Sequence, residues 1–283
     1  MKVISRVYGI KEYVTRARRE GKLIGFVPTM GWLHGGHLSL LRSAREECDV
    51  VIMSIFVNPT QFGPSEDLEK YPRDMERDKK LAEDAGADVL FAPSTGEMYP
   101  DGYATYVEVV GPLSQTMCGG ARPGHFRGVA TVVAKLFNIV EPDKSYFGQK
   151  DAQQAVIVKR MVKDLDMPFE VRVLPTVREE DGLAMSSRNS YLSEDQRRQA
   201  TGLFKSLKRA EEMARGGEVS AQSIKEEMKR ILLEGKSVRI DYIAIVDADS
   251  LEALDEVRDN TLIAVAAFVG GTRLIDNTII HHR

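Results

Sequence analysis

The stretch "FVPTMGWLHGGHLSLLRSAREECDVVIMSIFVNPTQF", residues 26–62, contains the strand–helix–strand pattern that decides the fold. The apolar run Lys22–Pro28 predicts a buried strand, and the leucines of His37–Cys48 recur at helical spacing. Asp49–Val57 predicts the next strand, which ends at an Asn-Pro turn. A unit of this kind favours parallel pairing of its two strands through a right-handed crossover.

The same alternation continues through the first two-thirds of the chain. Further helices are predicted at Asp74–Gly86, Gly128–Val140 and Asp151–Leu165, and further strands at Asp88–Phe91 and Ser145–Gly148. Alternating strands and helices are typical of an α/β doubly wound, Rossmann-like parallel sheet. Such sheets bind ligands beyond the carboxyl ends of their strands, which is where the loop of residues 29–37 begins.

The pattern changes after about Val177. Two long charged helices are predicted at Ser193–Gly217 and Ser220–Gly235, followed by about three strands. We therefore predict two domains, with residues 1–177 forming the Rossmann-like domain and residues 178–283 forming a smaller α+β C-terminal domain that acts as a lid.

Composition excludes several classes of protein. The formal net charge of −3 argues against a broad nucleic-acid-binding face. The N-terminus lacks the apolar core of a signal peptide, and no apolar run reaches membrane-spanning length. Cys48 and Cys118 are too few for a disulfide framework, and Cys48 is expected to be a packed thiol. We expect a cytoplasmic protein that binds neither membranes nor nucleic acid.

Two of the five histidines, His34 and His37, lie among glycines between the first predicted strand and its helix. A helix N-terminus presents unpaired N–H groups and a partial positive charge, so it attracts phosphate. If the helix begins near Gly35, both imidazoles lie on one face and can stabilise charge on a triphosphate that is being cleaved. A metal-binding pair and ordinary loop histidines are the alternatives.

Three other clusters carry polar side chains on loops. Asn58 and Gln61 follow the second strand and supply amides that can bind hydroxyl or carboxylate groups. Lys150 precedes a helix, where it can bind phosphate or carboxylate. The loop Gly182–Ser190 contains Ser186, Ser187 and Arg188, which suit a mobile phosphate clamp. Each cluster also has an ordinary structural explanation, and His125 in "RPGHFRG" is more consistent with a structural role.

Taken together, these clusters resemble the pantothenate synthetase (pantoate–β-alanine ligase) family. The motifs "PTMGWLHGGH", "FVNPTQF", "FGQKDAQQ", "MSSRN" and "IDN" occur in the family's order over essentially the full length. The resemblance implies a Rossmann-like fold of the H-x-G-H nucleotidyltransferase type. It also implies a homodimer that condenses pantoate with β-alanine, using ATP and Mg²⁺, through a pantoyl adenylate.

The resemblance also assigns roles to individual residues. His34, His37 and Lys150 are the catalytic candidates, with His37 at the position of the proton donor. Asn58, Gln61 and Gln154 match the pantoate and β-alanine site, and Asp78 lies near a position linked to magnesium. The matching ATP-binding positions are Met30, Gly31, Trp32, Leu33, His34, Gly35, Gly36, His37, Gly148, Gln149, Lys150, Asp151, Val177, Met185, Ser186, Ser187 and Arg188.

Two other functions remain open at this stage. Another H-x-G-H nucleotidyltransferase could transfer AMP to a phosphorylated acceptor, although that reaction would not need Gln61 and Gln154. A non-catalytic nucleotide sensor could keep the fold, although such a relative would be expected to lose one of the catalytic candidates.

Overall fold

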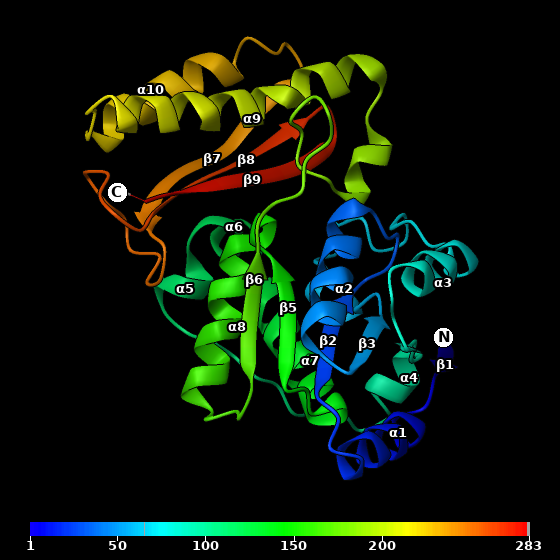
Figure 1. Cartoon of the computed structure of the whole chain (residues 1–283). Helices are drawn as coiled ribbons and strands as arrows, with labels where there is room; N and C mark the ends of the chain where they lie inside the picture. The colour runs from blue at the N-terminus through cyan, green and yellow to red at the C-terminus, as the bar shows by residue number, and fades with distance from the viewer. Residues whose placement is uncertain (65, 282–283) are drawn as a thin grey trace. The chain divides into compact units, whose positions relative to one another are not determined.

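The computed structural model describes residues 1–64 and 66–281, and these form two compact units (Figure 1). The first unit consists of Met1–Val109, Arg122–Gly148 and Ile157–Pro175. The second unit consists of Val110–Ala121, Gln149–Val156 and Thr176–Arg283. Residues 110–121, 149–156 and 176–177 of the predicted first domain therefore group with the second unit. The division into domains 1–177 and 178–283 stays a prediction.

The first unit is built on a parallel sheet, as predicted, and this sheet has six strands. Its strands are β1 (Lys2–Ile4), β2 (Ile24–Thr29), β3 (Val50–Ile55), β4 (Val89–Phe91), β5 (Lys144–Gly148) and β6 (Glu170–Leu174). Their order across the sheet is β1-β4-β3-β2-β5-β6, and every neighbouring pair is parallel. All six residues of β3 are buried, which explains why its sequence is a continuous apolar run.

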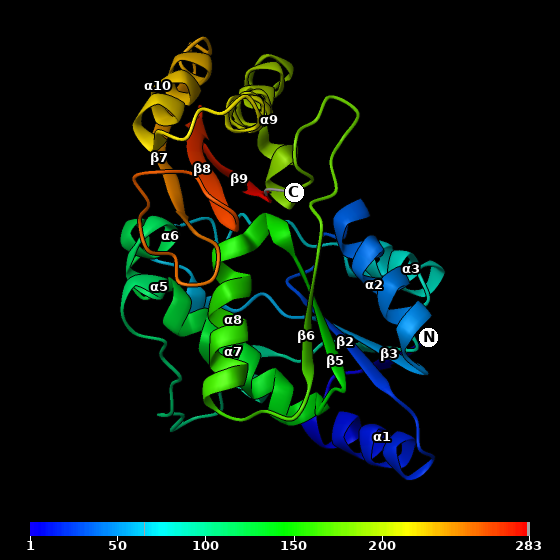
Figure 2. The same ribbon diagram turned by 60° about the vertical axis from the view of Figure 1, so that its left-hand side comes forward.

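Helices cover both faces of this sheet (Figure 2). On one face, α2 packs Leu41 and Ala44 against Val27 and Met53 of the strands. On the other face, Phe26 meets Phe137 with 6.4 Å between ring centroids. The helices of this unit are α1 (Val7–Arg19), α2 (Gly35–Glu47), α3 (Met75–Asp84), α4 (Thr95–Met98), α7 (His125–Val140) and, from Ile157, the remainder of α8 (Ala152–Asp164).

The switch point of the sheet lies at β2. The chain leaves β2 to form β3 on one side, and β5 later pairs with the other side of β2. The carboxyl ends of β2 and β5, at Thr29 and Gly148, are therefore the strand ends at which a doubly wound sheet binds ligands.

Several elements of the first unit were not predicted, among them β1, β6, α1 and α4. β1 is only three residues long, and β6 has the sequence "EVRVL", in which charged residues interrupt the apolar pattern. α1 buries Ile10, Val14 and Ala17, a spacing that predicts an amphipathic helix but was considered only as evidence against a signal peptide. The predicted helix Asp151–Leu165 is α8, which begins at Ala152 because Asp151 belongs to the short helix η2 (Gln149–Asp151).

The second unit has the two long helices and three strands that were predicted. β7 (Val238–Asp247), β8 (Thr261–Val269) and β9 (Thr272–Ile280) form an antiparallel sheet in that order. Leu203 and Leu207 of α9 pack with Ile263 and Val265 of β8 in a separate core. The helical elements are α5 (Pro112–Gln115), α6 (Met117–Ala121), η2, η3 (Ser187–Tyr191), α9 (Glu194–Arg215) and α10 (Ala221–Leu232).

Within residues 1–64 and 66–281, no helix is both long and apolar enough to cross a membrane. Cys48 and Cys118 are both buried and not disulfide-bonded. The Sγ atom of Cys48 lies 3.5 Å from the hydroxyl of Tyr146 in the core between α2 and the sheet, so the predicted packed thiol is confirmed.

A close contact between α7 and η1 (Pro59–Gln61) gives the first prediction. A Cβ atom added at Gly128 would lie 2.3 Å from the carbonyl oxygen of Thr60, whereas one added at Gly202 in α9 meets nothing within 4 Å. Gly128→Ala should lower the free energy of unfolding by about 1–3 kcal/mol through overpacking. Gly202→Ala should raise it by about 0.5–1 kcal/mol. If urea unfolding showed the same change in the free energy of unfolding for both variants, the close packing at Gly128 would be contradicted.

Candidate functional site

The H-x-G-H loop leaves β2 through two residues in the left-handed region. Gly31 has a φ of 86° and Trp32 a φ of 52°. Glycine adopts this conformation readily, but for a residue with a side chain it costs about 1–2 kcal/mol. The loop needs an interaction that holds Trp32 in place.

The buried carboxylate of Asp78, on α3, supplies that interaction. Its oxygens accept hydrogen bonds from the backbone N–H groups of Trp32 and Leu33, at 2.7 and 2.8 Å. Hydrogen bonds to a charged group stabilise by about 1.5–3 kcal/mol each, so together they outweigh the strain at Trp32. Burial raises the pKa of Asp78, although the bonds from Leu33 and Trp32 and the charge of Arg77 oppose that shift.

Arg77 clamps the same loop from the neighbouring position on α3. Its guanidinium donates to the carbonyl oxygen of Leu33 at 2.8 Å and to Asp78 at 3.1 Å. It also lies 5.0 Å from the centroid of the Trp32 ring, within the range of a cation–π contact. Arg77 and Asp78 together fix both sides of the Trp32–Leu33 backbone.

The two histidines then meet at the N-terminus of α2, as predicted. His34 is the N-cap residue, and its Nδ1 accepts a hydrogen bond from the N–H of Gly36 at 3.2 Å. The Nδ1 of His37 accepts from the N–H of His34 at 3.4 Å, and the ring centroids are 4.0 Å apart. Because both Nδ1 atoms act as acceptors, each neutral ring carries its proton on Nε2.

Asn58 and Gln61 lie in the loop after β3, but in different roles. Asn58 is fully buried, and its amide donates to the side-chain oxygen of Gln61 and to the carbonyl of Gly128, both at 3.1 Å. Its own oxygen accepts from Thr60 and Tyr99. These bonds occupy the Asn58 side chain, which orients Gln61, and direct contact of Asn58 with a ligand stays a prediction.

A chain of polar groups supports the backbone of Gln61. His125 Nδ1 lies 2.8 Å from the carbonyl oxygen of Gln61, and His125 Nε2 lies 2.8 Å from Arg122. Arg122 in turn makes two hydrogen bonds to Glu66. Burial would raise the pKa of Glu66, but the bonds and charge of Arg122 outweigh it, so the pKa is lowered. The structural role expected for His125 agrees with these contacts.

The second unit carries the other group of predicted residues. Lys150 lies in η2 and its Nζ is 3.9 Å from the carboxylate of Asp151. Gln153 is buried and its amide bonds to the backbone of Leu113, Thr116 and Cys118. Its neighbour Gln154 is half-buried, which leaves Gln154 as the better ligand candidate of the pair.

The loop of residues 177–188 is a short hairpin followed by η3. The N–H of Met185 bonds to the carbonyl of Val177, and Arg178 bridges to Ala184. Ser186 caps η3 by accepting a hydrogen bond from the N–H of Arg188 at 3.3 Å. The hairpin is thus ordered by its own backbone bonds.

The predicted residues divide between the two units as follows. The first unit holds Met30, Gly31, Trp32, Leu33, His34, Gly35, Gly36, His37, Asn58, Gln61, Asp78 and Gly148, and the second holds Gln149, Lys150, Asp151, Gln154, Val177, Met185, Ser186, Ser187 and Arg188. Sequence reasoning missed Arg77, Tyr99, Arg122 and Glu66, which support loops through contacts distant in sequence.

A resident magnesium ion does not fit Asp78. Both of its carboxylate oxygens already accept backbone N–H groups, and the side chain is 2% exposed. Across residues 1–64 and 66–281, no group of three or more His, Cys, Asp or Glu side chains is arranged to hold a metal ion. Asp78 therefore matches a loop anchor better than the expected metal ligand.

These features define the class: a Rossmann-like α/β protein with an H-x-G-H loop at the switch point of its sheet. The family model described as pantoate-beta-alanine ligase matches residues 2–279. The chain therefore belongs to the pantoate–β-alanine ligase family of enzymes.

Relatives agree with this assignment over the whole length. A pantothenate synthetase from Moorella thermoacetica is 55% identical, covering 99% of each chain. One from Thermotoga petrophila is 56% identical, covering 99% of this chain and 100% of the relative. The crystal structure of pantothenate synthetase from Thermus thermophilus matches with a TM-score of 0.95 and 47% identity, covering 100% of both chains.

A further solved structure carries ligands. The pantoate–β-alanine ligase from Francisella tularensis, complexed with "Beta-gamma ATP" and β-alanine, matches with a TM-score of 0.82 and 33% identity. It covers 99% of this chain and 97% of its own. The fold predicted for this chain, a parallel Rossmann-like sheet with a smaller α+β part, is confirmed.

The Asp78 anchor can be tested through Trp32, the only tryptophan in the chain. Asp78→Asn places an amide N–H₂ against a backbone N–H, so it should lower the free energy of unfolding by about 1–3 kcal/mol. It should also increase acrylamide quenching of Trp32 fluorescence in the ligand-free protein. Glu76→Gln, an exposed carboxylate on the same helix, is the matched control. Unchanged quenching in Asp78→Asn would rule out the anchor.

Proposed function

We propose that this chain condenses (R)-pantoate with β-alanine at the expense of ATP, giving pantothenate, AMP and diphosphate. The membership of the pantoate–β-alanine ligase family over residues 2–279 supports the overall reaction. The observation that carries the chemistry is the pair of imidazoles at the N-terminus of α2, both with Nδ1 turned toward backbone N–H groups.

The reaction requires the carboxylate to be activated. A carboxylate is a poor electrophile, so one of its oxygens first attacks the α-phosphorus of ATP, and the bond to the bridging oxygen breaks as diphosphate leaves. The amine of β-alanine then attacks the acyl carbon of pantoyl adenylate, loses a proton, and displaces AMP. Because no protein nucleophile is needed, positioning and charge stabilisation account for the catalysis.

His34 and His37 are suited to the first step. Their Nε2–H groups can donate to phosphate oxygens as negative charge moves toward the departing diphosphate. The N-terminus of α2 adds the partial positive charge of its peptide dipoles. The family resemblance implies that His37 is also a proton donor, a role that requires the protonated imidazolium form of its ring.

We assign the remaining residues as follows. Gln61 and Gln154 bind pantoate through their amides, and Gln61 also contributes to β-alanine binding, while Asn58 orients Gln61. Lys150 contacts phosphate, and the loop from Met185 to Arg188 closes over the nucleotide. Main-chain groups of Val177 bind adenine. The remaining ATP-binding residues in this proposal are Met30 to His37 and Gly148 to Asp151.

The metal, the oligomer and the location are also part of the proposal. Mg²⁺ arrives with ATP as part of the substrate, retains water ligands, and requires no all-protein cage. We expect a homodimer, as the family resemblance implies. The two buried thiols, which form no disulfide, suit a reducing compartment, and we place the protein in the cytoplasm.

The adenylate can be tested by omitting β-alanine. Pantoate should then support exchange of labelled diphosphate into ATP, and mass spectrometry should detect pantoyl adenylate on the enzyme. A phosphorylated acceptor should not support the exchange. Exchange with that acceptor alone would favour a simple nucleotidyltransferase, and ATP binding without turnover of pantoate and β-alanine would favour a nucleotide sensor.

A histidine substitution tests the role of the loop. His37→Ala should slow formation of the adenylate roughly 10²–10³-fold, which is the usual cost of removing one transition-state donor. His281→Ala, at an exposed histidine near the C-terminus, should leave the rate unchanged. Single-turnover kinetics would make the measurement, and a loss below about threefold would remove His37 from the chemistry.

A further inference from the structure

The "IDN" motif near the C-terminus has no role in the proposed chemistry, yet its two polar residues are almost completely buried. Asp276 is 2% exposed and Asn277 is 4% exposed, on adjacent positions of β9. Buried polar side chains are costly unless each of their groups is hydrogen-bonded. The partners of these two residues therefore show what the motif does.

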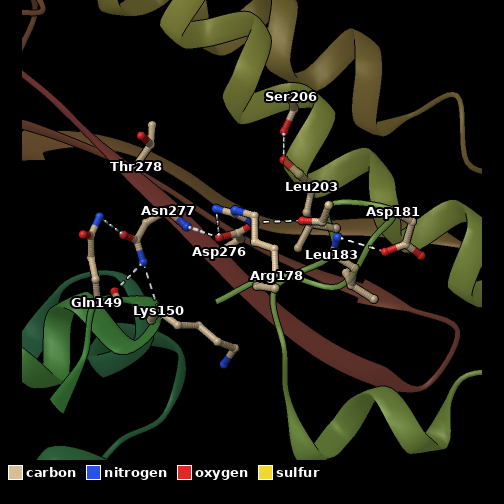
Figure 3. Close-up of polar contacts among 12 residues, drawn as sticks. Gln149, Lys150, Arg178, Asp181, Leu183, Leu203, Ser206, Asp276, Asn277 and Thr278 are labelled. Atoms are coloured by element: carbon tan, nitrogen blue, oxygen red, sulfur yellow. Dashed lines mark hydrogen bonds and ion pairs between the residues drawn. The ribbon is translucent and has the colours of Figure 1, made fainter. Parts of the chain in front are cut away.

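Asn277 holds the turn that carries Lys150. Its side-chain nitrogen donates to the carbonyl oxygens of Gln149 and Lys150, both at 2.9 Å. Its side-chain oxygen accepts a hydrogen bond from the side-chain Nε2 of Gln149 at 3.3 Å. One amide thus binds two consecutive peptide groups of η2 and fixes the backbone from which the Lys150 side chain extends (Figure 3).

Asp276 holds the hairpin that forms the first part of the 177–188 loop. Its carboxylate accepts two hydrogen bonds from Arg178, at 2.6 and 3.0 Å, and Arg178 also donates to the carbonyl of Gly182 at 3.1 Å. The Arg178 guanidinium packs 4.6 Å from the centroid of the Phe204 ring on α9. Burial raises the pKa of Asp276, and the ion pair with Arg178 opposes that shift.

Adjacent residues of a strand point to opposite faces of the sheet. Asp276 projects toward Arg178 and Asn277 projects toward η2, and Figure 3 shows the two side chains leaving β9 in opposite directions. The N–H of Asn277 also donates to Asp276 at 2.8 Å, which fixes the carboxylate. One strand thereby holds two segments that are well separated in the chain.

We propose that Asp276 and Asn277 are positioning residues that set the phosphate-binding turn of Lys150 and the 177–188 loop relative to one another. This inference rests on the proposed function, because Lys150 and the 177–188 loop are assigned to ATP binding only by that proposal. Neither residue acts on substrate. Each acts through the segment that it holds, Asn277 through Lys150 and Asp276 through the hairpin that leads to Arg188.

The experiment compares Asn277→Ala and Asp276→Asn with Thr278→Val. Thr278 is the next residue of β9 and bonds to Glu211 on α9, so Thr278→Val removes a hydrogen bond of the same strand without touching either segment. If Asp276→Asn does not fold, Arg178→Lys takes its place. It removes the two-pronged hydrogen bonding to Asp276 by changing Arg178, the more exposed residue of this ion pair.

Hydrogen exchange of the ligand-free protein gives a readout that does not depend on activity. Asn277→Ala should speed exchange in residues 149–156 and leave residues 177–188 unchanged. Asp276→Asn should speed exchange in residues 177–188, where the N–H groups of Gly182 and Met185 are hydrogen-bonded. The inference would be overturned if Asn277→Ala and Asp276→Asn exchanged at the same rate as the unmodified protein in these residues. It would also be overturned if Thr278→Val showed the same faster exchange. Either result would stand even if the proposed reaction holds.

Kinetics test whether Asn277 works through Lys150. Asn277→Ala should lower kcat/KM for ATP roughly 10- to 100-fold, as expected when a catalytic group is misplaced. Combined with Lys150→Ala, it should add no further loss, because effects of residues that act as a unit are not additive. If the two substitutions lowered kcat/KM by factors that multiply in the double variant, Asn277 would act independently of Lys150. If the unmodified protein makes no pantothenate, the proposed function fails while hydrogen exchange still decides the positioning role.

Discussion

The buried carboxylate of Asp78 is the contact on which the proposed site depends. It holds Trp32 in a left-handed backbone conformation that the side chain alone disfavours, and so it sets where α2 begins. The start of α2 decides that His34 is the N-cap and His37 the third helical residue. If α2 began one residue later, His34 would lie outside the cap position, and its side chain would no longer accept the N–H of Gly36.

A second principle recurs across the molecule: buried polar side chains hold the segments that carry the reactive groups. Asn58 orients Gln61, and Asn277 holds the turn of Lys150, in each case through an amide with both ends bonded. Fully bonded amides of this kind are rigid because a change of rotamer leaves buried groups unpaired. The side chain of Gln61 and the backbone of Lys150 are thereby held in place.

Much of the fold and part of the site could be predicted from the sequence. The apolar run of β3 and the leucine spacing of α2 are local signals, and the pairing of His34 with His37 follows from helical geometry. β6 was missed because its charged residues break the pattern. The contact of Asp78 with the loop spans 45 residues, so no local pattern reveals it, and only the family resemblance linked Asp78 to magnesium. The bonds of Asn58 could not be predicted either, because only its contact with Gly128 in the folded chain shows that its amide is already occupied.

The central claim is that a triphosphate meets the two imidazoles at the N-terminus of α2. The most direct measurement is a crystal structure of this protein with a non-hydrolysable ATP analogue and pantoate. We predict phosphate oxygens within hydrogen-bonding distance of Nε2 in both His34 and His37. A triphosphate bound elsewhere, with these rings contacting only protein, would contradict the account.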